Sequence, residues 1–136
     1  MPDENDSRAA KDRATGARGF ILSWGIPLAM VLSVNFLGLS TFASQSLVVA
    51  GLVWMGLACL LNARRCGRVH CLFTGPWFLL GAAVLTVDLI GILPLSDDQS
   101  TLVANITFAG ALVLWFLSER IWGKYWEKSP TAPKSG

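Results

Sequence analysis

Charge is scarce in this sequence. Asp, Glu, Lys and Arg make up 15% of its 136 residues, whereas soluble domains carry about 25%. A water-exposed domain of this size needs more polar surface than that. Hydrophobic residues account for 53%, which excludes a disordered chain, and three cysteines are too few for a disulfide scaffold. The class that remains is a single membrane-embedded unit, with the lipid bilayer as its main partner.

Several kinds of chemistry lack their residues or motifs. The single histidine excludes a haem pair or a histidine-rich metal centre within one chain. No glycine-rich phosphate loop is present, which argues against ATP-driven pumping, and no Ser/His/Asp set is recognisable. The net charge of +2 is too small to indicate a nucleic-acid partner. We therefore expect a protein that is neither an enzyme nor a nucleic-acid-binding protein.

Long uncharged runs supply the predicted membrane spans. Between Gly19 and Ala63, 45 consecutive residues lack Asp, Glu, Lys and Arg. One straight helix of that length would be about 68 Å long, against a hydrocarbon core of about 30 Å, so the run must fold back. Its polar, small-residue interruption lies at 38–46. Backbone groups in lipid must be satisfied within each segment. The fold class is therefore all-α, a four-helix transmembrane bundle with spans near 20–39, 46–63, 77–95 and 102–122.

The basic residues predict how the bundle is oriented. All eleven Lys and Arg residues fall in the N-terminal segment, in 64–68 or beyond residue 119, while the third connection carries Asp97 and Asp98. Cytoplasmic segments of membrane proteins carry the excess of Lys and Arg. We therefore expect both termini and the middle connection in the cytoplasm of a prokaryote, in a multi-pass inner-membrane protein. Residues 1–18 and 127–136 are predicted to be disordered cytoplasmic tails flanking a membrane domain at 19–126.

Reactive side chains concentrate in the middle connection, predicted as a loop over 64–76. Cys66, His70 and Cys71, which include the one histidine, fall within six residues and are flanked by three arginines. Nearby arginines favour thiolates, and the cytosol keeps thiols reduced. Thiolates bind soft ions such as Hg(II), Cu(I) and Zn(II), but this set is too small for a four-ligand zinc site. We predict a solvent-reachable transfer site in which Cys66 and Cys71 are ligands and His70 assists.

The third cysteine extends this prediction into the second span. If that helix continues into the loop, Met55, Cys59, Asn62 and Cys66 lie on one stripe of it, and Cys59 relays the ion between membrane and loop. A structural interpretation stays open. Cys59 and Met55 are also ordinary packing residues, and His70 and the arginines also suit an interfacial loop that only sets topology.

Asp88 is the one charged residue well inside a predicted span, away from its ends. Such a residue costs at least about 2.5 kcal/mol at the centre of a bilayer, so it is a functional candidate. Asn35 and Asn105 fall at similar depth in the first and fourth spans. The three side chains form either a stepping stone on the outer part of a transport path or an interhelical hydrogen-bond knot. The sequence favours neither.

Two resemblances rest on residues 65–71, which read R-C-G-R-V-H-C. This loop is similar to a signature of small uncharacterised prokaryotic four-span membrane proteins, a resemblance that implies no activity. Together with Cys59 it also resembles the bacterial mercuric-ion transport proteins, short inner-membrane proteins that use cysteine pairs in a span and in a cytoplasmic loop. That resemblance implies mercury transport, although the first span here lacks the cysteine pair typical of that family.

The leading hypothesis is therefore an integral membrane protein that binds and transfers a soft metal ion of the mercuric or copper type. A second is a non-catalytic accessory or assembly subunit whose cysteines tolerate serine. A third is a membrane thiol oxidoreductase, since disulfide-forming membrane enzymes also pair four spans with cysteines and bind a quinone. Cytoplasmic cysteines argue against the third. Four helices leave little room for a pore, so we expect a homo-oligomer or a larger membrane partner.

Overall fold

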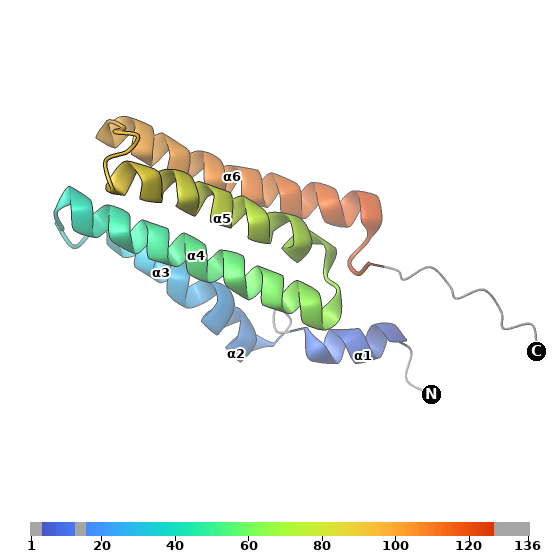
Figure 1. Ribbon diagram of the computed structural model, residues 1–136. Helices are drawn as coiled ribbons and strands as arrows, with labels where there is room; N and C mark the ends of the chain where they lie inside the picture. The colour runs from blue at the N-terminus through green and yellow to red at the C-terminus, as the bar shows by residue number, and fades with distance from the viewer. Residues whose placement is uncertain (1–3, 13–15, 127–136) are drawn as a thin grey trace, which may run out of the picture.

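In the computed structural model (Figure 1), residues 4–12 and 16–126 are described, and this part of the chain is all-helical. The predicted all-α class is therefore confirmed. The elements in chain order are α1 (Glu4–Lys11), α2 (Ala17–Phe20), η1 (Ile21–Gly25), α3 (Ile26–Ser33), α4 (Thr41–Cys66), α5 (Val69–Leu89) and α6 (Asp97–Trp122).

Three of these helices, α4, α5 and α6, are long and apolar enough to cross a membrane. The chain is therefore a membrane protein with at least three candidate spans. The predicted first span corresponds to a shorter apolar helix over Ala17–Ser33, formed by α2, η1 and α3. Its π-helical turn η1 ends two residues before Pro27, which has no N–H to donate to the helical ladder. The fourth span stays a prediction.

The long helices lie side by side with α5 between α4 and α6, and α3 lies along α4 (Figure 1). At one end of the bundle are the α4–α5 turn, α1 and residues 123–126. We call this the basic end, because Arg18, Arg64, Arg65, Arg68 and Arg120 all lie there. The opposite end, here the acidic end, holds the connections 34–40 and 90–96 and begins α6 with Asp97 and Asp98.

Only Gly67 and Arg68 separate α4 from α5, so the predicted loop over 64–76 is wrong. Helix α4 stops at Gly67, whose φ of 69° is left-handed and whose N–H bonds to Ala63 O at 2.8 Å. Such a glycine is a strong helix stop. Pro76, the last residue of the predicted loop, lies inside α5. Proline is tolerated inside membrane helices because neighbouring groups satisfy the freed carbonyl.

The backbones of α4 and α5 approach closely at Gly56 and Gly75. A Cβ atom added to Gly75 would lie 3.2 Å from Gly56 O and 2.9 Å from Leu60 Cγ, and one added to Gly56 would lie 3.0 Å from Gly75 O. Small residues permit such approaches between membrane helices. On the acidic side of this contact lies an apolar core of Leu52, Met55, Phe78, Ala82, Leu85 and Ala111. On the basic side the interior becomes polar.

Large apolar side chains cover the outside of the bundle. Phe36 is 87% exposed, Ile92 72% and Phe116 67%. In water such a surface would drive aggregation, whereas in a bilayer it contacts lipid chains. The exposure therefore agrees with the membrane class.

Gly75→Val tests the α4–α5 contact. Added methyl groups meet Leu60 and the Gly56 carbonyl, and such overpacking costs about 1–3 kcal/mol, more than the small gain in helix propensity. We expect a lower melting temperature in detergent, followed by tryptophan fluorescence. Gly16→Val is the control, because no atom of the described residues lies within 4 Å of a Cβ at Gly16. Equal melting temperatures for the two variants would contradict the close approach.

Candidate functional site

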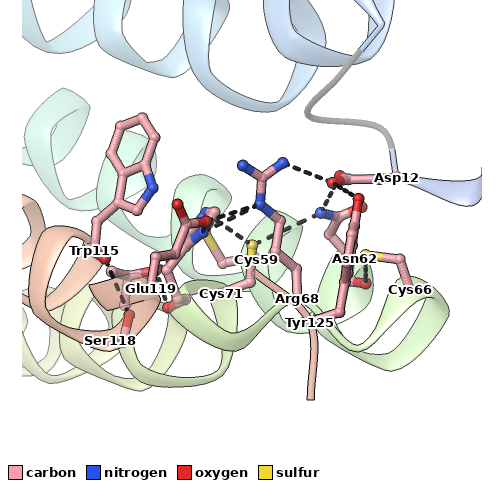
Figure 2. Close-up of polar contacts among 12 residues, drawn as sticks. Asp12, Cys59, Asn62, Cys66, Arg68, Cys71, Trp115, Ser118, Glu119 and Tyr125 are labelled. Carbon is pink, nitrogen blue, oxygen red and sulfur yellow. Dashed lines mark hydrogen bonds and ion pairs between the residues drawn. The ribbon is translucent and has the colours of Figure 1, made fainter. Parts of the chain in front are cut away.

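Polar and sulfur-bearing side chains gather inside the basic half of the bundle (Figure 2). We call them the buried polar cluster. They come from the segment after α1, from α4, from the α4–α5 turn, from α5, from α6 and from the segment that follows α6. Its members are Asp12, Cys59, Asn62, Cys66, Arg68, His70, Cys71, Thr74, Glu119 and Tyr125.

The side chains of Cys59 and Cys71 are close neighbours across the α4–α5 contact. Cys71 Sγ lies 3.3 Å from His70 Nε2 and accepts from Asn62 Nδ2 at 3.7 Å. Thr74 Oγ1 donates to His70 O at 2.9 Å and lies 3.6 Å from Cys59 Sγ. The structure therefore brings together two thiols and one imidazole.

Cys66 is not part of this pair. Its thiol donates to Asn62 O at 3.1 Å, and Figure 2 shows it on the other side of Asn62 from Cys71. The predicted pairing of Cys66 with Cys71 thus differs from the structure, in which the sulfur neighbour of Cys71 is Cys59. All three thiols are buried, with exposed fractions of 1–2%, so the expectation of solvent-reachable thiols is wrong. The cause is the early start of α5, which places Cys71 in its first turn, inside the bundle.

A carboxylate orients the imidazole of His70. His70 Nδ1 lies 2.6 Å from Glu119 Oε1 and 3.2 Å from Arg68 Nε, and the shorter contact with the carboxylate favours a proton on Nδ1. In the neutral ring Nε2 then carries the lone pair, and this is the nitrogen that faces Cys71 Sγ. Carboxylates fix the tautomer of metal-binding and proton-accepting histidines in the same way. His70 Nε2 is therefore poised to accept the Cys71 proton or to bind a cation beside the sulfur.

Arg68 carries the positive charge of the cluster. Its Nη1 lies 2.6 Å from Asp12 Oδ2, and its Nε lies 3.2 Å from both Glu119 Oε1 and His70 Nδ1. Burial alone lowers the pKa of Arg68, but the two carboxylates raise that pKa above its ordinary value. Arg68 therefore stays charged, and it connects the segment after α1 to α6.

Both terminal segments cover the α4–α5 turn. Val69 N donates to Lys124 O at 3.2 Å, Trp126 N donates to Gly67 O at 2.9 Å, and Arg8 Nη1 donates to Trp126 O at 2.6 Å. Tyr125 Oη donates to Asp12 Oδ2 at 3.4 Å, and burial together with the nearby carboxylate raises the pKa of Tyr125. These contacts separate the thiols from the surface at the basic end.

Sequence reasoning missed Asp12 and Glu119. Asp12 was assigned to a disordered tail over 1–18, but α1 occupies Glu4–Lys11 and the Asp12 side chain is 0% exposed. Residues 1–3 and 13–15 and the predicted C-terminal tail, 127–136, lie outside the described residues. One signal for Glu119 was available: it is the only acidic residue among the last residues of a predicted span whose end is basic.

Asp88 lies at the acidic end, far from the thiols along α5. Its Oδ2 accepts from Gln45 Nε2 at 2.5 Å and from Ser100 Oγ at 2.7 Å, and its Oδ1 accepts from Leu95 N at 2.8 Å. These bonds tie α4, α5 and α6 together and favour the interpretation as an interhelical knot. The predicted companions Asn35 and Asn105 are not among its partners.

Within the described residues, no group of three or more His, Cys, Asp or Glu side chains is arranged to hold a metal ion. The arrangement is therefore not a closed polydentate site. What it offers is two adjacent thiols, an imidazole nitrogen beside one of them and a carboxylate behind the imidazole. Two thiols suffice for a soft cation that prefers low coordination numbers.

Arg68→Met tests the charge pairing inside the cluster. Removing the cation takes its charge away from the buried Asp12 carboxylate and the partly exposed Glu119 carboxylate, and breaking a buried pair costs about 3–5 kcal/mol. We expect a large loss of thermal stability in detergent, partly restored in the double variant Asp12→Asn/Arg68→Met. Arg65→Met, at an exposed position of the same turn region, should change little. A loss that the double variant deepens additively would contradict the pairing.

No family model, curated protein or solved structure matches the chain. The two resemblances of the loop sequence therefore stay predictions. The features of the molecule that bear on its function are the buried polar cluster and the membrane-length helices.

Proposed function

We propose that this membrane protein binds one soft, thiol-seeking cation between Cys59 and Cys71 and transfers it at the cytoplasmic side of a prokaryotic inner membrane. One observation carries the proposal: the two thiols are close neighbours, and His70, held by Glu119 through Nδ1, presents Nε2 to Cys71 Sγ at 3.3 Å. The function expected from sequence is kept, with Cys59 in place of Cys66 as partner of Cys71.

The donor set selects the class of ion. Sulfur and imidazole donors favour Hg(II), Cu(I) and Zn(II) over hard cations such as Mg²⁺ and Ca²⁺, which bind oxygen. A structural zinc site needs four ligands, and one chain supplies two thiols and one imidazole here. Ions that accept two sulfur ligands, Hg(II) and Cu(I), therefore fit the set better than Zn(II).

Charge favours a divalent ion among these two. When Hg(II) replaces the protons of both thiols, two protons leave and the net charge of the site does not change. Cu(I) bound in the same way adds one negative charge inside the bundle, and uncompensated buried charge is costly. The ion that fits best is therefore mercuric.

Cys66 gives the bound ion a way towards the basic end. Asn62 contacts Cys66 and Cys71. Its side-chain Nδ2 donates to Cys71 Sγ, and its backbone carbonyl oxygen accepts from the Cys66 thiol. Thiol–thiol transfer requires a second sulfur nearby, and Cys66 is the nearest one towards the turn. The terminal segments that cover the turn must open for release. Asp88, Asn35 and Asn105, expected on an outer transport path, have no role in this proposal.

A second candidate, a membrane thiol oxidoreductase, is favoured by the same proximity of Cys59 to Cys71. In that reaction both thiols lose their protons, a sulfur–sulfur bond forms, and two electrons pass to a quinone in the membrane. Neither reaction occurs in the remaining alternative, an accessory subunit, for which all three cysteines tolerate serine.

Cation titration in detergent separates these functions. Under reducing, competitor-buffered conditions we expect one Hg(II) per chain in the wild type, and loss of tight binding in Cys59→Ser/Cys71→Ser. Glu119→Gln should weaken binding by about tenfold to hundredfold, as for other carboxylates behind a histidine ligand. Cys66→Ser is the matched control and should retain the affinity of the wild type.

Three results of this titration would contradict the proposal. Equal binding by the wild type and Cys59→Ser/Cys71→Ser would show that these two thiols do not form the cation site. Loss of binding in Cys66→Ser alone would show that Cys66 is a ligand, as the pairing with Cys71 expected from the sequence requires. No soft-cation binding together with quinone reduction that requires both Cys59 and Cys71 supports the oxidoreductase instead.

Reporter fusions test the orientation, which rests on the distribution of basic residues. We expect alkaline phosphatase to be inactive, and green fluorescent protein to be fluorescent, when either is fused after Trp126 in a bacterial host. A fusion after Ser96, at the acidic end, should behave in the opposite way. If both positions report the same side, the number of spans between them is even and the four-span topology is wrong.

A further inference from the structure

A crevice of about 600 Å³ lies between α3, α4 and α6, with Leu85 of α5 at its back. Its volume is within the range of about 300–1,000 Å³ that is typical of small-molecule sites. The crevice belongs to the acidic half of the bundle, whereas the thiols lie in the basic half. A ligand in this crevice would therefore be distinct from the cation proposed at the thiols.

The lining of the crevice changes from polar to apolar along its length. On α4 and α6 the lining residues recur at helical spacing, so each helix contributes one face. The first lining residue of α4 is Thr41 and the last is Val48. On α6 the lining is, in order from the acidic end, Asp97, Ser100, Thr101, Ala104, Asn105 and Phe108.

Aromatic packing closes the deep end. Phe108, the last lining residue of α6, packs against Phe78 with ring centroids 5.9 Å apart, and Trp24 packs against Phe78 at 5.7 Å and against Trp115 at 6.4 Å. A path for a hydrated ion would need polar groups to continue inward. The crevice instead ends on apolar rings, so its depth suits a hydrocarbon chain.

The mouth and the wall carry neutral hydrogen-bonding groups. Asp97 is the only charged side chain that lines the crevice, and the described lining includes no Lys or Arg. A phosphate head would meet a carboxylate and no cation, whereas an uncharged polyol head would meet amides and hydroxyls.

Asn105 supplies an independent pointer to a ligand. It lies eight residues into α6, about 12 Å from the first residue of that helix, and it is exposed. Its side-chain amide makes no hydrogen bond to any described residue. An unsatisfied amide at membrane depth is costly, and a hydroxyl on a bound molecule would satisfy it.

We propose that this crevice binds an amphiphile with one hydrocarbon chain and an uncharged hydroxylated head, of the monoacylglycerol class. The chain lies against Leu28, Val48 and Phe108, and the head lies among Gln45, Ser100 and Asn105, towards the acidic end. No cysteine is among the described residues that line the crevice. A negative result for cation binding therefore does not contradict the crevice proposal, and the reverse also holds.

Native mass spectrometry of the full chain in detergent tests this site, with 1-monooleoylglycerol as the probe. Ala104→Trp fills the crevice and should lower the bound fraction by at least about tenfold, because the chain loses its buried apolar contacts. Ala109→Trp, an exposed position of the same helix that does not line the crevice, should bind like the wild type. Lysophosphatidylglycerol with the same oleoyl chain should bind at least about tenfold more weakly because of its anionic head.

A milder variant, Asn105→Leu, keeps the test informative if Ala104→Trp does not fold. It removes only the exposed amide, so the melting temperature should not fall, while monooleoylglycerol binding weakens. Equal binding to Ala104→Trp and Ala109→Trp would overturn the site, and equal binding of the two probes would overturn the neutral head. A dimer in the wild type that Ala104→Trp dissociates would mean that a second copy of the chain fills the crevice.

Discussion

The contact between α4 and α5 at Gly56 and Gly75 is the constraint on which the rest of the structure depends. Any larger residue at either position would separate the two backbones, because an added Cβ meets the carbonyl of the facing glycine at 3.0–3.2 Å. Cys59 follows Gly56 by three residues and Cys71 precedes Gly75 by four, so both side chains lie about one turn towards the basic end. The two cysteines are therefore neighbours because the two helices approach closely at the glycines.

Burial of charge explains why both terminal segments are ordered beside the turn. Arg68 lies in the turn between α4 and α5, where its side chain is largely buried. Because a guanidinium does not lose its proton, this buried charge needs carboxylate partners. The carboxylates that balance it come from opposite ends of the chain, Asp12 before the first apolar helix and Glu119 near the end of α6. Glu119 also holds His70, so the same carboxylate that neutralises the arginine sets the direction of the imidazole lone pair. Charge balance and thiol chemistry are therefore coupled through one side chain.

Much of the architecture followed from the sequence, because hydropathy and length act locally. The helical class and three of the long apolar helices were predicted correctly. The loop between α4 and α5 was not, because Pro76 is a strong breaker in water but is tolerated in a membrane helix, whereas Gly67 is the actual stop. The site was predicted only in part. Its cysteines and histidine were identified, but the partner of Cys71 depends on the helix phase after that stop, and Asp12 and Glu119 join the cluster through contacts 56 and 51 residues apart in the chain from Arg68.

The central claim is that Cys59 and Cys71 hold one soft cation between them, with His70 and Glu119 beside them. X-ray absorption spectroscopy of the Hg(II)-loaded protein tests it most directly, because this method counts the sulfur atoms bound to the metal. The account predicts two sulfur neighbours in the wild type and in Cys66→Ser, and at most one in Cys59→Ser. A metal bound by nitrogen and oxygen alone, or two sulfur neighbours that persist in Cys59→Ser, would contradict it.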